Sequence, residues 1–224
     1  MVCCVQYSGI MDETRKPGME RRGVRVHLAS KSPRRRELLL GAGIEHDAAH
    51  PGVDDGSLSP GAVSPEQWVM ALAYLKASTA ARAIARHAER GGTQVVVLGA
   101  DTVVVHRGTL IGQPEDAADA RRMLLAMRDD VHDVVTGVAL VDPITGRREL
   151  FVDRAVVRVG HIPDEAIEAY VNSNAWRGKA GAYNLSERLQ AGWPIQFEGD
   201  AGTIMGLPVA KVVERLARWS ETTR

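Results

Sequence analysis

The sequence predicts an α/β protein with a mixed, twisted sheet. Continuous β-branched runs, typical of strands buried on both faces, alternate with segments whose apolar residues recur at helical spacing. Two longer strand-like runs, 131–141 and 149–160, are joined by a turn at 142–146 and add a hairpin to the alternating pattern. The chain has 224 residues, enough for one large domain or two lobes around a substantial core.

In the first half of the chain, residues 1–23 mix Gly, Pro, Arg and Glu and predict a disordered tail. We predict strands over residues 24–29, 45–48, 94–100, 103–105 and 109–111, the last two forming a hairpin. Pro33 stands at the first position of a helix, because its missing N–H costs nothing there. A long helix is predicted over 65–90, ended by Gly91-Gly92, after a loop rich in Gly, Ser, Pro and Asp.

In the second half, apolar residues at helical spacing predict an amphipathic helix over 117–127. The strand pair 131–141 and 149–160 follows, and then a helix over 163–172. A closing helix over 209–219 carries Pro208 in its first turn.

Composition excludes several classes of function. Lys plus Arg and Asp plus Glu both number 28, so zero net charge argues against nonspecific nucleic-acid binding. The only cysteines, Cys3 and Cys4, are adjacent and provide neither a disulfide framework nor a metal quartet, which favours a cytoplasmic location. No apolar run approaches the ~20 residues needed to cross a bilayer, so we expect no membrane partner.

The stretch Ser30-Lys31-Ser32-Pro33-Arg34-Arg35-Arg36-Glu37 lies between the first strand and the first helix. Hydroxyls, free N–H groups of the first helical turn and guanidinium groups meet there, which predicts a binding site for an anion such as a polyphosphate. The alternative is a capped surface helix with a basic first turn. That alternative needs a reason, because positive charge at a helix N-terminus opposes the helix dipole.

Three charged residues carry the predicted chemistry. Asp101 follows the run 94–100, so we expect it at the C-terminal end of a buried strand, as a magnesium ligand or a base. A turn-forming aspartate is the alternative. Lys76 borders the apolar stripe of the long helix, where a snorkelling lysine is equally compatible with the sequence. Glu37 could hold a metal or pair with a neighbouring arginine.

Two further segments carry polar groups. Alternation over 132–137 puts His132 and Thr136 on one strand face, and we interpret the histidine as structural rather than catalytic. The segment Lys179-Ala180-Gly181-Ala182-Tyr183 has small residues that let a backbone approach a ligand, although a glycine-rich turn explains them as well.

In this order, the motifs resemble the Maf family of nucleoside triphosphate pyrophosphatases, from about Val26 to Leu216. The resemblance rests on the Ser30–Glu37 stretch, Lys76-Ala77, Gly99-Ala100-Asp101-Thr102, His132-Asp133-Val134-Val135-Thr136-Gly137, Lys179–Tyr183 and Gly206-Leu207-Pro208. It implies a single catalytic domain over 24–220, with two lobes around a deep cleft, similar to inosine triphosphate pyrophosphatases, and a homodimer. It also implies cleavage of a nucleoside triphosphate to its monophosphate and pyrophosphate with a divalent cation, Mg²⁺ or alternatively Mn²⁺.

The resemblance also implies roles for individual residues. Asp101 matches the catalytic aspartate and a metal ligand, and Glu37 matches an acidic position near the metal. The positions matched to substrate contacts are Ser30, Ser32, Arg34, Arg35, Lys76, Gln113, Lys179 and Glu187.

The chain departs from the family pattern at two places. Gln113-Pro114 replaces the common Lys-Pro, which removes one cation from the cleft. After Tyr183, Asn184-Leu185-Ser186-Glu187 replaces the common Gly-Ile-Gln, and 188–198 is an unusual aromatic-containing stretch.

Arg34 resembles the subgroup acting on dTTP and UTP, whereas Glu187 resembles the subgroup acting on 7-methyl-GTP, so the base preference stays open. A nucleotide-binding regulator with little turnover is the alternative function, and RNA binding through Arg34–Arg36 is disfavoured by the zero net charge.

Overall fold

The computed structural model of the chain describes residues 24–54, 58–86 and 94–221. Its helices are α1 (Pro33–Gly41), α2 (Pro65–Ala85), α3 (Ala117–Met127), α4 (Asp164–Asn172), the short 3₁₀ helix η1 (Ala180–Ala182), α5 (Leu185–Gln190), α6 (Ala201–Met205) and α7 (Val209–Glu221). Its strands are β1 (Arg25–Ala29), β2 (His46–Ala49), β3 (Val95–His106), β4 (Thr109–Ile111), β5 (Asp130–Val141), β6 (Arg148–Val159) and β7 (Ile195–Glu198). The predicted α/β class with a mixed sheet is confirmed. The long helix predicted over 65–90 ends at Ala85, with Arg86 as its C-cap. The tail prediction for residues 1–23 and the predicted stop at Gly91-Gly92 lie outside the described residues.

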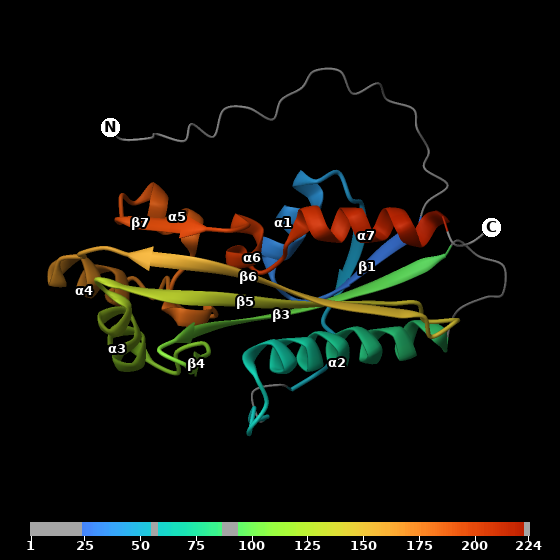
Figure 1. The fold of residues 1–224 in the computed structure, drawn as a ribbon, viewed down its shortest axis with the longest axis horizontal. Coiled ribbons are helices and arrows are strands. Elements are labelled where there is room, and N and C mark those ends of the chain that lie inside the picture. The colour runs from blue at the N-terminus through green and yellow to red at the C-terminus, as the bar shows by residue number, and fades with distance from the viewer. Residues whose placement is uncertain (1–23, 55–57, 87–93, 222–224) are drawn as a thin grey trace, which may run out of the picture.

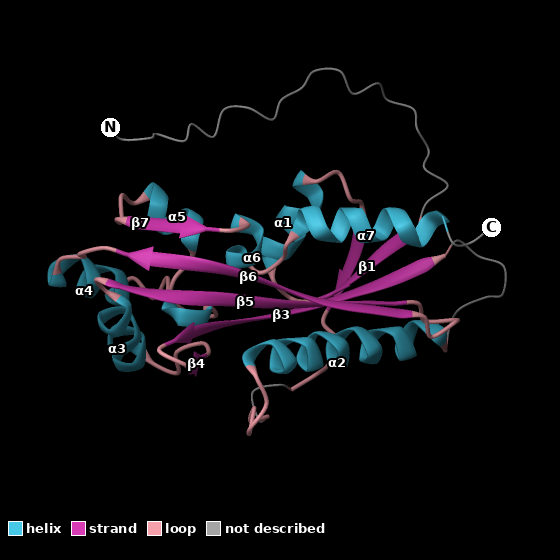
Figure 2. Cartoon of the chain, in the orientation of Figure 1, coloured by secondary structure: helices cyan, strands magenta, loops and turns pink. Residues whose placement is uncertain are grey.

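A seven-stranded sheet forms the centre of the molecule, in the order β2-β1-β3-β5-β6-β7 with β4 added to β3 (Figures 1 and 2). β1 pairs in parallel with β2 and β3, whereas β3, β5, β6 and β7 pair antiparallel. The parallel unit brings the C-terminal end of β1 and the start of α1 against β3. This arrangement places the Ser30–Glu37 stretch beside the middle of β3.

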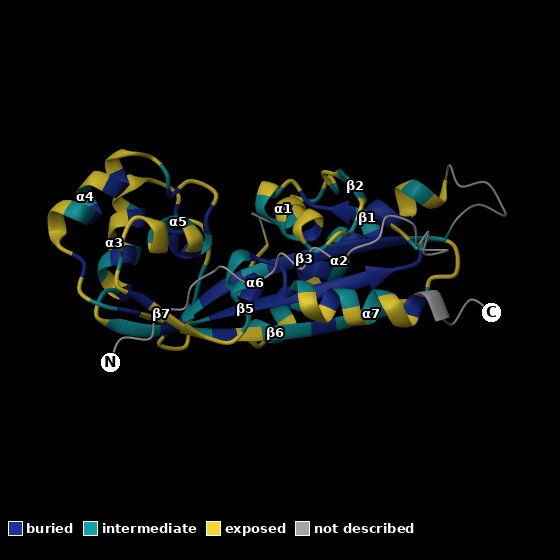
Figure 3. Cartoon of the chain, turned by 90° about the horizontal axis from the view of Figure 1, so that it is seen from above, coloured by how far each residue is buried: buried dark blue, intermediate teal, exposed yellow. Residues whose placement is uncertain are grey.

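The helices cover both faces of the sheet and one of its ends. α2 lies along one face and α7 along the other, with α1 and α6 beside α7 (Figure 1). α3, α4 and α5 gather around the far ends of β5 and β6 (Figure 3). The core is correspondingly divided, because the side chains of α7 and β1 belong to one apolar cluster and those of α3 and α4 to another. We call the part of the fold around β1, α1, α2 and α7 one lobe and the part around α3, α4 and α5 the other, and each contains an apolar cluster of its own.

α2 approaches the sheet closely because small residues face each other. Its inner side carries Ala73 and Ala77, both fully buried, over Gly99 of β3, and the backbone of Val69 over Gly137 of β5. A Cβ added to Gly99 would lie 2.3 Å from the carbonyl oxygen of Ala73, and one added to Gly137 would lie 2.5 Å from the carbonyl oxygen of Val69. The two glycines therefore set the distance between helix and sheet.

β3 corrects the prediction for Asp101. Instead of ending near residue 100, it is a continuous 12-residue strand, and Asp101 lies in its middle. The strand continues because β5 pairs with it from Val97 to Val105, whereas β1 pairs with it only as far as Leu98. As expected for ligand sites of open α/β sheets, a parallel strand does end at the site, but that strand is β1 and not β3.

The elements α5, β7 and α6 were not predicted. The side chain of Asn184 caps α5 by accepting from the N–H of Glu187, three residues into the helix. An asparagine followed at this spacing by glutamate is a helix-start signal that could have revealed α5. β7 is a four-residue edge strand with three exposed positions, too short for a clear alternating pattern.

Candidate active site

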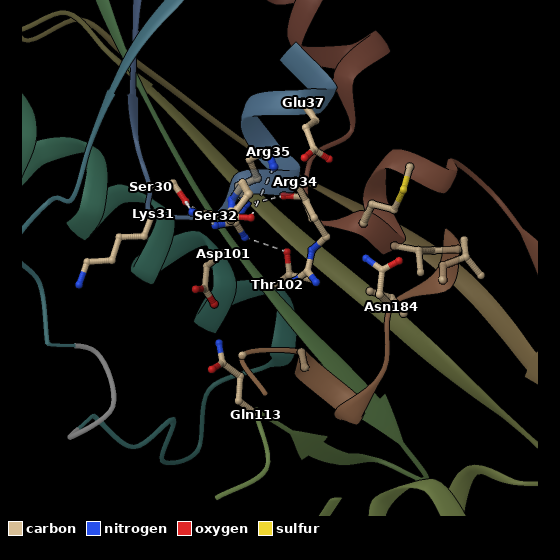
Figure 4. Close-up of a pocket in the computed structure, with 18 of the residues that line it drawn as sticks. Ser30, Lys31, Ser32, Arg34, Arg35, Glu37, Asp101, Thr102, Gln113 and Asn184 are labelled. Carbon is tan, nitrogen blue, oxygen red and sulfur yellow. Dashed lines mark hydrogen bonds between the residues drawn. The ribbon is translucent and has the colours of Figure 1, made fainter. Parts of the chain in front are cut away.

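A cavity of about 800 Å³ lies between the two lobes. One wall comes from β1, α1, α2 and β3, and the other from the segment after β4, the η1–α5 region and the end of α6. Its lining includes Ser30, Lys31, Ser32, Arg34, Arg35, Glu37, Lys76, Asp101, Thr102, Gln113, Arg177, Tyr183, Asn184, Leu185, Glu187, Ile204, Met205 and Gly206. Figure 4 shows these groups converging from segments far apart in the sequence.

The first turn of α1 forms one end of the cavity. Ser32 is the N-cap, and its hydroxyl oxygen accepts from the N–H of Arg35 at 3.4 Å, while Pro33 occupies the first helical position. The hydroxyl oxygen of Ser30 accepts from the N–H of Ser32 at 3.2 Å. The predicted capped turn is therefore present, and it faces the cavity.

Arg35 ties this turn to the rest of the site. Its guanidinium donates to the carbonyl oxygen of Gly206 at 2.8 Å, to Ser30 Oγ at 3.2 Å and to Thr102 Oγ1 at 3.2 Å. Thr102 Oγ1 lies 2.8 Å from Thr136 Oγ1. Arg35 thus links α1, β1, β3 and the end of α6, in addition to its predicted place beside the substrate.

Arg34 differs from its neighbour. Its side chain extends from α1 along the cavity (Figure 4), and within the described part of the chain its buried Nε has no hydrogen-bond partner. A buried, unpartnered donor of a charged group is costly. An anionic ligand in the cavity would supply the missing acceptor.

Asp101 and Lys76 form a close ion pair, with Nζ 2.6 Å from Oδ1 and both side chains less than 15% exposed. Lys76 therefore points inward from α2 and is not a snorkelling surface lysine. Asp101 is likewise no turn-forming residue, since it lies within a strand. The pair places one carboxylate and one ammonium group opposite the first turn of α1.

The other end of the cavity is apolar with a few polar groups. Tyr183, Leu185, Ile204 and Met205 line it. Buried behind it, the ring Nε2 of His132 lies 2.8 Å from the hydroxyl oxygen of Tyr183. Burial lowers the pKa of His132 to about 4 and raises that of Tyr183, so the pair is neutral. This geometry agrees with the interpretation of His132 as structural.

Glu187 lines the same end of the cavity and forms an ion pair with Lys179. Lys179 is buried. Glu187 lines the cavity, but Lys179 does not. The structure therefore brings together every predicted site residue except Lys179, which contacts the site through Glu187.

The carboxylates of Asp101 and Glu37 both line the cavity, where a divalent cation could use them. Among the described residues, no group of three or more His, Cys, Asp or Glu side chains could hold a metal ion. Mg²⁺ commonly uses only one or two carboxylates and takes its other oxygens from substrate phosphates and water. Asp101 fits that role. Glu37 lines the cavity and forms no ion pair within the described segments, contrary to the arginine pairing considered for it.

Thr102, Asn184 and Gly206 are site residues that were not assigned roles from the sequence. Thr102 and Gly206 accept hydrogen bonds from Arg35, and Asn184 is a buried cavity residue. The motifs containing Thr102 and Gly206 were visible, but their contacts with Arg35 join chain segments 67 and 171 residues apart. No membrane-crossing helix is found within the described ranges.

The fold and the site together are those of an enzyme that handles phosphate groups. The chain matches the family model of Maf-like proteins over residues 25–219. It is 41% identical over 196 residues to the dTTP/UTP pyrophosphatase of Geotalea uraniireducens, covering 86% of this chain and 94% of the relative. It is 35% identical over 193 residues to the dTTP/UTP pyrophosphatase of Thermotoga maritima, covering 86% and 88%.

The chain therefore belongs to the Maf-like protein family, and the predicted class, a hydrolase of phosphoric anhydride bonds, is confirmed. A solved nucleoside-triphosphatase / dITP/XTP pyrophosphatase from Mycobacterium abscessus aligns with 62% of this chain and 76% of its own at a TM-score of 0.36 and 15% identity, a likeness too weak to argue from.

Proposed function

We propose that this chain hydrolyses dTTP and UTP to the nucleoside monophosphate and pyrophosphate. The observation that carries the proposal is the Lys76–Asp101 pair facing the first turn of α1 and the unpartnered Nε of Arg34 across one cavity. The names of the relatives supply the choice of base. Glu187 was the feature favouring 7-methyl-GTP, and its ion pair with Lys179 weakens that alternative.

In the proposed reaction, water attacks the α-phosphorus, the bond from that phosphorus to the bridging oxygen breaks, and pyrophosphate leaves. Asp101 orients the water and accepts its proton. Arg34 and Lys76 lie where they can stabilise the charge that develops on the phosphate oxygens. Arg35 holds the walls of the site in position through its contacts to Ser30, Thr102 and Gly206.

A divalent cation, Mg²⁺ or Mn²⁺, is part of the proposal. Asp101 would hold it together with phosphate oxygens, with Glu37 as the second predicted ligand. When bound, the ion would neutralise phosphate charge and polarise the bond being broken. A homodimer and a cytoplasmic location also remain predictions, and sedimentation of the purified chain tests the first of them.

Pyrophosphate release from a panel of nucleoside triphosphates tests the function. We expect dTTP and UTP to be turned over faster than 7-methyl-GTP, and chelation of divalent cations to stop the reaction. Asp101→Asn should lower kcat by about 10²-fold or more while keeping the fold, because the amide cannot accept the proton. Asp47→Asn, which alters an exposed ion pair with Arg25, is the matched control and should retain activity.

Two results would contradict the proposal. Near-wild-type turnover by the Asp101→Asn variant would remove Asp101 from its role. Tight nucleotide binding without pyrophosphate release by the wild type would favour a regulator, in line with the cation missing at Gln113.

A further inference from the structure

Asn184 is a polar residue buried at the wall of the cavity. It lines the cavity and is only 5% exposed. Its Oδ1 accepts from the N–H of Glu187 at 3.0 Å and from the hydroxyl of Ser186 at 2.7 Å, which caps α5. Both contacts use the same oxygen of the side-chain amide.

These contacts fix the orientation of the amide. A backbone N–H can only donate, so the group that faces the N–H of Glu187 must be the carbonyl oxygen of the amide. The NH₂ group of Asn184 therefore faces away from α5. Within the described segments, no residue accepts a hydrogen bond from its Nδ2. Because Asn184 lines the cavity, its Nδ2 is available to an acceptor on a ligand bound there.

The position of Asn184 indicates which part of a nucleotide it would meet. Ser30, Lys31 and Asp101 lie at the opposite side of the view in Figure 4, with Thr102 and Arg34 between them and Asn184. Asp101 and the Ser30 side of the turn before α1 therefore lie away from Asn184, and Arg34 lies between the two. The neighbours of Asn184 in the lining, Leu185, Ile204 and Met205, are apolar and suit the faces of a base.

We propose that Asn184 determines base specificity by donating a hydrogen bond from Nδ2 to the carbonyl oxygen at ring position 4 of the base. The proposal rests on the proposed function and adds the residue that selects the substrate. Uracil and thymine carry a carbonyl oxygen at ring position 4, whereas cytosine carries an amino group there. If cytosine bound there, its amino group would face the NH₂ group of Asn184, and neither donor would have an acceptor. Uracil or thymine should therefore bind better than cytosine.

The ratio of kcat/KM for UTP to that for CTP tests this proposal. The two substrates share ribose, triphosphate and any metal, so changes in the electrostatics of phosphate binding cancel in the ratio. Asn184→Asp keeps the size of the side chain and its capping oxygen, since Asp and Asn are equally good N-caps, but removes the donor. We expect the UTP/CTP ratio to fall by about 10-fold to 100-fold, as for one mismatched buried polar contact.

Ser186→Ala is the matched control. It removes the second contact to Oδ1 without touching Nδ2, and it should leave the UTP/CTP ratio unchanged. Asn184→Ser, which also caps a helix but carries no amide, should lower the ratio as Asn184→Asp does and guards against misfolding of the first variant. Thermal denaturation of each variant verifies the fold.

An unchanged UTP/CTP ratio in either folded Asn184 variant would overturn the role of Asn184 in base specificity. The proposed function is tested separately, because UTP hydrolysis by the wild type supports it whatever the ratio. If the wild type does not hydrolyse UTP, the proposed function fails on its own. In that case, calorimetry of UMP and CMP binding tests the role of Asn184. Equal affinities of the wild type for the two nucleotides would overturn the role of Asn184. A preference for UMP that is lost in Asn184→Asp would support it.

Discussion

Replacing Gly99 with alanine should push α2 away from the sheet and lower both stability and activity. A Cβ at this position would lie 2.3 Å from the carbonyl oxygen of Ala73 and 2.8 Å from the backbone nitrogen of Ala77, whereas ordinary contacts begin at 3.4 Å. The obstacles are backbone atoms, which cannot rotate aside. The helix would have to move by about 1 Å, the shortfall between 2.3 and 3.4 Å.

Overpacking of this kind costs about 1–3 kcal/mol in the free energy of unfolding. The smaller conformational entropy of an unfolded chain with alanine offsets about 0.4–1 kcal/mol, so we expect a net loss of about 1–2 kcal/mol. The same movement displaces Lys76, whose Nζ lies 2.6 Å from Asp101 on the strand that carries Gly99. A misplacement of about 1 Å can reduce kcat by about 10²-fold.

Urea denaturation and pyrophosphate release measure the two effects. Gly41→Ala is the control, because a Cβ there meets no atom within 4 Å beyond its own helix and chain neighbours, and its backbone is not left-handed. Its activity should match the wild type, and its stability should rise by about 0.4–1 kcal/mol rather than fall. Gly99→Ala with wild-type stability and kcat would refute the claim that Gly99 sets the distance between α2 and the sheet.

Three other variants follow from the site. Arg35→Ala should lower the free energy of unfolding by about 2 kcal/mol and also weaken substrate binding, because its charged group makes three hydrogen bonds within the protein; urea denaturation with no loss would contradict this. Burial lowers the pKa of His132 from 6.5 to about 4. Between these two pH values the imidazole binds a proton in the unfolded chain but not in the folded one, so the free energy of unfolding should fall by about 3 kcal/mol as the pH falls from 6.5 to 4. His132→Gln should flatten that part of the pH profile. Glu187→Gln should change the ratio of kcat/KM for UTP to that for 7-methyl-GTP by less than about threefold, because Lys179 already neutralises the carboxylate, and a shift of 10-fold or more toward UTP would instead show that Glu187 contacts the base.

The regular elements could be predicted where the sequence pattern is long. α2 has 21 residues and a Ser64 cap that exchanges hydrogen bonds with Gln67, and the long strands β5 and β6 are separated by a turn signal. The prediction was wrong about the end of β3, because local sequence does not show that β5 keeps pairing beyond the end of β1. α5 and β7 have only six and four residues, too few for a periodic apolar pattern, although the local Asn184 cap marks the start of α5.

The sequence by itself determined the capped, arginine-rich turn at Ser32 and the buried strand that leads to Asp101. Both depend on local chemistry, namely the hydroxyl and proline at a helix start and a run of β-branched residues. Only the tertiary structure decided that Lys76 pairs with Asp101, that Arg35 binds Gly206 and that the amide of Asn184 turns toward the cavity. The contacts of Lys76 and Arg35 join segments far apart in the sequence, and these partners are set by how the helices and the sheet pack, which local sequence does not encode. The capping contact of Asn184 is local, but the packing of α5 decides that the amide lines the cavity.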